Sequence, residues 1–192
     1  NTTADFNVAV GSFSLAANTT GTLNTGLGQQ ALTANTTANN NTAVGSLSLL
    51  ANTTGSNNTA LGFCANATST DRGDNTAIGY LALKVNAATG NTAVGAYSAD
   101  SNTDGTDIVA IGNRALCSNT TGACNTAVGK SSLPANTSGE DNTAVGYQSL
   151  NANTTGECNV AVGVMAMKTN TTAECNTAIG MTSLSANTTG HQ

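Results

Sequence analysis

Asparagine followed two residues later by serine or threonine is the acceptor sequence for N-linked glycans, and this chain repeats it many times. Nine acceptors recur at one place of a repeating unit: Asn1, Asn18, Asn35, Asn52, Asn119, Asn136, Asn153, Asn170 and Asn187. Three more, Asn40, Asn57 and Asn66, fall elsewhere in the unit. Two interpretations stay open: the asparagines form turns, since Asn tolerates left-handed backbone, or one edge of the molecule bears covalent N-glycans. Where Ser69 replaces the recurring asparagine, Asn66 supplies an acceptor nearby, which favours glycans.

The five cysteines indicate disulfide chemistry. Cys124, Cys158 and Cys175 share one place in the unit, so stacked copies would bring Cys158 and Cys175 to the Cα separation of roughly 5 Å that a disulfide requires. Cys117 and Cys124 flank a short loop that they could close, whereas Cys64 has no evident partner. Disulfides form in oxidising compartments, so they predict, like the glycan acceptors, an extracellular or cell-surface protein.

Residues 100–107, DSNTDGTD, match the opening of a calcium-binding loop. Asp100, Asn102, Asp104 and Asp107 would supply oxygen ligands, which calcium prefers. The glutamate expected at the twelfth place is absent, because Ile111 stands there, so an acidic turn without metal is the alternative. No other cofactor is expected.

Catalytic chemistry is not indicated, since no carboxylate pair, nucleophile with a base, or His/Cys cluster is evident, and we expect no enzyme. Residues 72–74 spell Arg-Gly-Asp, a short match to an integrin-type ligand that carries little weight. The formal net charge is -5 with only 8% charged residues, so nucleic acid would find no basic stripe. No apolar run is long enough to predict a membrane span.

A tandem repeat places all of these residues. Aligning the chain on Asn-x-Ala-Val-Gly divides it into eleven units that start at residues 7, 24, 41, 58, 75, 91, 108, 125, 142, 159 and 176, after a partial unit at 1–6. Each unit has seventeen residues except the one starting at residue 75, which lacks one residue near 87–90. Residues 1–192 are therefore expected to form a single repeat domain. Places in each unit are called positions 1 to 17 below.

The columns of the alignment predict a core. Position 4 is always aliphatic and position 9 is Leu or Met except at Asn66 and Ala99, so these two columns are predicted to fill the interior. Position 3 is Ala except at Gly26, and with the invariant Gly of position 5 it is expected to leave a smooth outer strip where another chain could pack. That glycine would permit a positive φ or a close backbone approach. The Asn of position 1, interrupted only by Ile108, predicts an amide ladder between units.

Two short apolar segments, at positions 2–4 and 7–9, are too brief for helices and predict strands, while the Gly and the Asn-Thr-Thr-Gly after them predict turns. Each unit then forms one coil of an all-β parallel β-solenoid, or β-roll, of about eleven coils with two short strands per coil. At roughly 4.8 Å per coil the rod would be on the order of 50 Å long.

The segments NTAVGYQSL, NTAIGYLAL and NTAVGSLSL resemble the repeats of YadA-type trimeric autotransporter adhesin heads, whose units carry Ser-Val-Ala-Ile-Gly. They are also similar to phage tail-fibre repeats. The resemblance covers the whole chain and implies a left-handed parallel β-roll, commonly trimeric, that works as an extracellular adhesive or spacer. It implies no catalytic residues. The unit of this chain is longer than that of the adhesin head by the Asn-Thr-Thr-Gly turn.

We therefore expect an extracellular, N-glycosylated structural repeat protein that assembles into or extends a fibre. Neither end carries a recognisable polar cap, so either these residues are part of a longer chain or the open ends stack on other subunits. We expect self-association, as a head-to-tail filament or as a trimer. The alternative is an adhesin head or tail-fibre shaft that binds a receptor or surface glycan. A minor alternative is an ice-binding solenoid that uses the threonine columns at positions 13 and 14.

Overall fold

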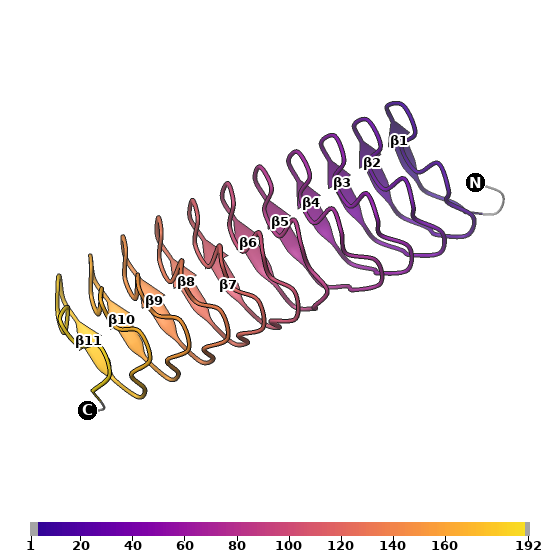
Figure 1. Ribbon diagram of the computed structural model, residues 1–192. Coiled ribbons are helices and arrows are strands. Elements are labelled where there is room, and N and C mark those ends of the chain that lie inside the picture. The colour runs from indigo at the N-terminus through magenta and orange to yellow at the C-terminus, as the bar shows by residue number, and fades with distance from the viewer. Residues whose placement is uncertain (1–3, 191–192) are drawn as a thin grey trace.

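The computed structural model describes residues 4–190, which form a β-solenoid with eleven strands and no helix (Figure 1). The strands lie in one parallel sheet in chain order, so the rod runs from the N-terminal coil to the C-terminal coil. The strands are β1 Val8–Val10, β2 Thr25–Leu27, β3 Thr42–Val44, β4 Thr59–Leu61, β5 Thr76–Ile78, β6 Thr92–Val94, β7 Val109–Ile111, β8 Thr126–Val128, β9 Thr143–Val145, β10 Val160–Val162 and β11 Thr177–Ile179.

The coils stack in strict register. In β9 and β10, for example, Ala144 pairs with Ala161 and Val145 with Val162, and every other pair of neighbouring strands matches equivalent positions in the same way. Each residue type therefore forms a column along the rod. The sequence prediction of a parallel β-solenoid with one coil per repeat unit is confirmed, because the strands recur at the spacing of the units.

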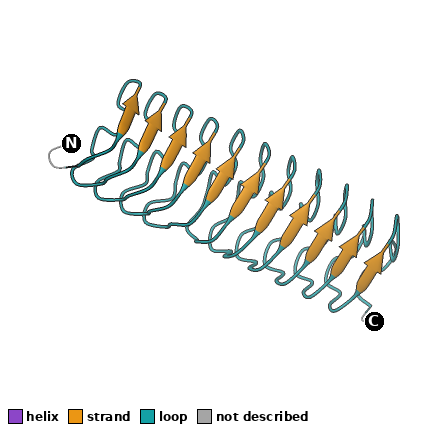
Figure 2. Ribbon diagram, turned by 180° about the vertical axis from the view of Figure 1, so that it is seen from behind, coloured by secondary structure: helices purple, strands orange, loops and turns teal. Residues whose placement is uncertain are grey.

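The prediction of two strands per coil is wrong. Each coil has one three-residue strand, and positions 7–9 form a turn instead; in Figure 2 all strands lie along one face and loops complete each coil. The backbone explains the difference: Leu47 and Leu49, at positions 7 and 9, have φ of 62° and 48°, in the left-handed region that a strand excludes. This segment still bonds between coils, since Leu49 N–H donates to Ala65 O at 3.1 Å.

The strand faces also differ from the prediction. Position 3, not position 4, points into the core: Ala144 and Ala161 are fully buried, as is Leu150 at position 9. At Gly26, the one glycine in this column, an added Cβ would lie 2.5 Å from Ser14 Oγ of the preceding coil, so alanine is excluded there. The aliphatic side chains of position 4 consequently lie on the outside of the sheet, and the smooth outer strip predicted from positions 3 and 5 does not exist.

The invariant glycine of position 5 is required for both of the predicted reasons. Gly45 has φ of +129°, a conformation that side chains rarely adopt. A Cβ at Gly45 would also lie 2.6 Å from Gly62 O in the next coil. The column therefore permits the coils to stack closely at the bend that follows each strand.

The predicted amide ladder at position 1 is present inside the rod. Asn58 is fully buried, its backbone N–H donates to Asn41 Oδ1 at 2.9 Å, and its own Oδ1 accepts the backbone N–H of Asn75 at 3.1 Å. Its Nδ2 donates to Arg72 O at 2.9 Å within the same coil. Each coil is thus joined to the next by side-chain as well as backbone hydrogen bonds, which makes burial of the polar amide tolerable.

Candidate interaction surfaces

The outer face of the sheet is a continuous surface made of two columns, position 2 and position 4, over β1 to β11. We call it the outer sheet face. Position 4 is aliphatic in every coil, and position 2 is Thr or Val. Among the aliphatic residues, Leu27 is 44% exposed, Leu61 48% and Ile111 39%. Although each side chain is partly covered by its neighbours in the column, together they form an apolar ridge along the rod, and such patches usually mark interaction sites.

The asparagines of position 12, which carry most of the predicted glycans, form a second buried ladder. Asn136 is fully buried, and its Nδ2 donates both to Asn119 Oδ1 at 2.8 Å and to Gly139 O at 2.9 Å. The same burial holds for Asn18, Asn35, Asn52, Asn119, Asn153 and Asn170. A glycan attached at Nδ2 would replace one of its two hydrogens, so at least one of these bonds would be lost and a sugar would lie inside the coil. The predicted row of glycans at these positions is therefore corrected: the asparagines hold the solenoid together.

The remaining glycan acceptors differ in their environment. Asn66 is buried, so it is corrected with the others. Asn187 is half-buried in the last described coil, and Asn1 lies outside the described residues. Asn40 and Asn57, at position 17, are exposed and lie one above the other, with Asn40 Nδ2 donating to Asn57 Oδ1 at 3.2 Å. Of the twelve predicted acceptors, this pair has the exposure that a glycan requires.

The predicted calcium ligands do not converge, and that prediction is corrected too. Asn102 is buried in the position 12 ladder, where its Nδ2 donates to Gly105 O at 2.9 Å. Within residues 4–190, no three His, Cys, Asp or Glu side chains are grouped closely enough to hold a metal ion, so Asp100, Asp104 and Asp107 do not form a site. Asp100 instead faces a partly buried environment, and this desolvation raises the pKa of its carboxyl above the ordinary value, opposed by Arg114 and Lys84.

The five cysteines are free thiols, so neither predicted disulfide is formed. Cys117 is buried, with its Sγ 3.5 Å from Pro134 O, whereas Cys124 is exposed. Cys158 and Cys175 are both exposed on neighbouring coils, and their thiols interact. Desolvation and then the Cys175 thiol raise the pKa of Cys158, with the Asp141 carboxylate acting in the same direction. A Cys158–Cys175 bridge stays a prediction.

The threonines of position 13, considered for ice binding, bond along the rod. Thr120 Oγ1 donates to Thr137 O at 2.8 Å, and Thr137 Oγ1 donates to Thr154 O at 3.1 Å. The same contact recurs in most coils. These hydroxyl hydrogens stabilise the turn, and they are not available to order water.

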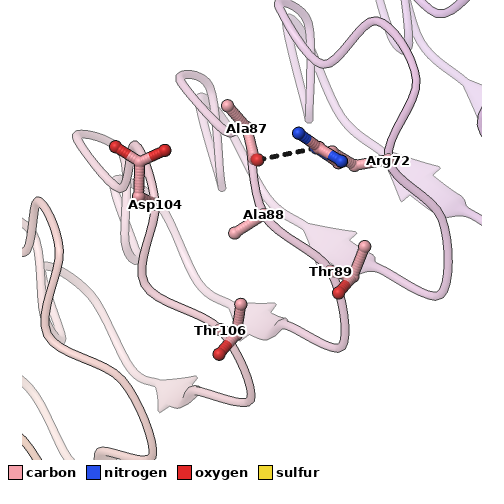
Figure 3. A pocket seen from close by; sticks show the side chains of 6 residues that line it. All are labelled: Arg72, Ala87, Ala88, Thr89, Asp104 and Thr106. Atoms are coloured by element: carbon pink, nitrogen blue, oxygen red, sulfur yellow. Dashed lines mark hydrogen bonds between the residues drawn. The ribbon is translucent and has the colours of Figure 1, made fainter.

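A hollow interrupts this turn where the shortened coil lies between two full-length coils (Figure 3). We call it the notch. It has a volume of about 190 Å³ and is lined by Arg72, Ala87, Ala88, Thr89, Asp104 and Thr106. Arg72, part of the Arg-Gly-Asp sequence, reaches across to the short coil, where its Nε donates to Ala87 O at 2.9 Å. Asp74, the acid of that sequence, accepts a bond from Asn57 Nδ2 at 3.0 Å.

The sequence contained signals for both surfaces, although neither was predicted as a site. The outer sheet face was visible as the invariant aliphatic column, which was assigned to the core. The notch was visible as the missing residue near 87–90 together with Arg72, the only arginine or lysine at its place in the repeat. The notch was thus indicated by residues that depart from the repeat and not by the residues that the repeat shares.

The fold and these surfaces define a β-solenoid tandem-repeat protein with an apolar outer sheet face and a polar notch. Comparison with protein families, curated proteins and solved structures found no match to this chain. Residues 4–190 contain no helix that is long and apolar enough to cross a membrane.

Proposed function

We propose that this chain is an extracellular structural rod whose copies associate side by side through the outer sheet face, forming or extending a fibre. The observation that carries the proposal is the position of the aliphatic column, which a monomer would leave in contact with water along its whole length. Burial of apolar area is the main driving force for association, and this face has it in every coil.

The composition of the face supports a second copy as the partner. No charged residue stands at position 2 or position 4 in any coil, so two such faces meet without charge repulsion. The side-chain pattern repeats once per coil, and another copy presents the same spacing, so ridges and grooves stay matched along the rod. A face roughly 50 Å long and 10 Å wide gives about 500 Å², so two faces bury about 1,000 Å², which reaches the lower bound for a specific interface.

The resemblance to YadA-type adhesin heads and phage tail fibres supports the same arrangement, because those repeats commonly work as trimers. An adhesin head or fibre shaft is therefore the second candidate function. It differs from a purely structural rod in binding a receptor or surface glycan, and the notch favours it as a polar hollow on a rod that is otherwise regular.

Sedimentation analysis and negative-stain imaging test the assembly. We expect the wild-type chain at a multiple of its 18.8 kDa mass. A triple variant, Val128→Lys, Val145→Lys and Val162→Lys, should sediment as a monomer, because it places three charges on the outer sheet face. The matched control puts three lysines in the same coils at exposed position 14: Ser138→Lys, Thr155→Lys and Thr172→Lys.

Circular dichroism of both triple variants confirms that the solenoid is retained. The proposal fails if the wild-type chain is a monomer at micromolar concentration, or if the position 4 variant assembles as the control does. A monomeric wild-type chain that shows thermal hysteresis would assign the outer sheet face to ice instead of to a second copy.

A further inference from the structure

The notch is the place where the hydrogen-bond pattern of the turn is broken. In regular coils, the backbone N–H groups of positions 13 and 14 donate to the position 13 carbonyl of the next coil, as Thr120 and Thr121 do to Thr137 O at 2.9 and 3.0 Å. Ahead of the short coil, the N–H groups of Thr70 and Asp71 make no such bond within the described residues. Ala87 O accepts the Arg72 side chain in their place.

Several polar groups of the notch consequently have no partner. The terminal nitrogens of Arg72 and the hydroxyls of Thr89 and Thr106 make no hydrogen bond within residues 4–190. Figure 3 shows Arg72 and Asp104 on opposite sides of the hollow, with Ala87 and Ala88 between them. The coils that carry these two side chains are separated by the short coil, so they stand roughly 10 Å apart along the rod.

We propose that the notch binds one residue of an acidic saccharide, a sugar ring that carries a carboxylate. The guanidinium of Arg72 would pair with the sugar carboxylate. Its Nε already donates to Ala87 O, which fixes its orientation, and its two terminal nitrogens form a planar pair of donors. On the other side, the Asp104 carboxylate would accept hydrogen bonds from ring hydroxyls. The exposed methyl group of Ala87 gives the apolar contact that the ring face needs.

The mixed charge of the notch favours this ligand over a simple anion. Asp71 lies 3.5 Å from Arg72 Nε and repels any anion that binds there, whereas Asp104 lies across the hollow, where sulfate would place further negative charge. A sugar acid places its negative charge at one end and hydroxyl donors at the other, which matches the arrangement. The volume of about 190 Å³ suits a single sugar ring.

The test uses the full chain and a trimer of galacturonic acid, with binding followed by NMR titration. The methyl ester of the same trimer is the ligand control, because it keeps the shape and removes the charge. We expect saturable binding of the acid and at least tenfold weaker binding of the ester. Arg72→Gln should weaken binding of the acid at least tenfold, whereas Arg114→Gln, which removes an arginine elsewhere, should leave it unchanged.

Two further variants separate a sugar site from an anion site. Asp104→Asn should weaken binding of the acid trimer severalfold, whereas Asp141→Asn, its control, should leave binding unchanged. Insertion of one alanine after Ala87 should abolish binding, because it restores the full-length coil. Circular dichroism establishes that the insertion variant keeps the fold. The proposal is overturned if the acid does not bind at millimolar concentration, if the ester binds equally, if Arg72→Gln has no effect, or if sulfate binds as tightly as the trimer.

Discussion

Asn66 stands in the leucine column of position 9 and is the clearest weak point of the core. Its side chain is 1% exposed, and neither Oδ1 nor Nδ2 has a hydrogen-bond partner. In the preceding and following coils, the same position is occupied by Leu49 and Leu83, which are both fully buried. Replacing Asn66 with leucine would therefore remove an unpaired amide and restore the apolar column, and we expect Asn66→Leu to stabilise this coil.

The size of the effect follows from two contributions. A buried polar group without a partner costs about 1–3 kcal/mol, and full burial of a leucine side chain is worth about 1.5–3 kcal/mol. Allowing for incomplete repacking, Asn66→Leu should raise the local free energy of opening by about 3 kcal/mol, which is roughly a hundredfold change in the opening equilibrium.

Native-state hydrogen exchange is the suitable assay, because a solenoid opens locally and a single global unfolding energy is poorly defined for it. The amide hydrogen at residue 66 reports on the coil, since its N–H donates to Ala82 O at 3.0 Å. Its exchange should slow about a hundredfold in Asn66→Leu. Leu150→Asn, the reverse change in a regular coil, should accelerate exchange in its own coil. Unchanged or faster exchange in Asn66→Leu would refute the reasoning and show that the amide is satisfied.

Burial raises the pKa of Asp100 in the folded chain. Above that raised pKa the carboxyl is charged and partly buried, which lowers the stability of the folded state. Below the ordinary value of 3.8 the carboxyl is neutral in both the folded and the unfolded state, and this cost is absent. Asp100→Asn should therefore increase thermal stability at pH 7 and make no difference below pH 3.8. Among glycan acceptors, mass spectrometry of chain secreted from a eukaryotic host should find glycans at Asn40 and Asn57 and none at Asn52; a glycan on Asn52 in folded protein would contradict its burial.

The repeat made most of the architecture predictable. The coil length, the parallel stacking, the glycine bend and the position 1 amide ladder were all evident in the columns, because each column obeys one local constraint repeated eleven times. The orientation of the strand was not evident. A strand of three residues has too few side chains to reveal its alternation, and size alone suggested that Val145 rather than Ala144 was inside.

The burial of the position 12 asparagines was hidden for a different reason. Asparagine is usually exposed, and its sequence here also fits a glycan acceptor or a turn. Its burial depends on two acceptors: the carbonyl three residues later in the same turn, and the amide of the neighbouring coil, which is in place only once the coils are stacked.

The departures from the repeat gather in one part of the rod. The coil that starts at Asn58 has Asn66 in the leucine column and Ser69 in the asparagine column, and the next coil lacks a residue. Ser69 Oγ is buried without a partner, and so is Asn52 Oδ1, which an asparagine at residue 69 would have satisfied. Other coils depart from the columns singly, as at Gly26, Ala99 and Ile108. Clustered departures that cost local stability are typical of functional sites, where function compensates for the cost. The notch formed by Arg72 and Asp104 lies beside these violations, which supports the proposal that ligand recognition is located in the irregular coils of this rod.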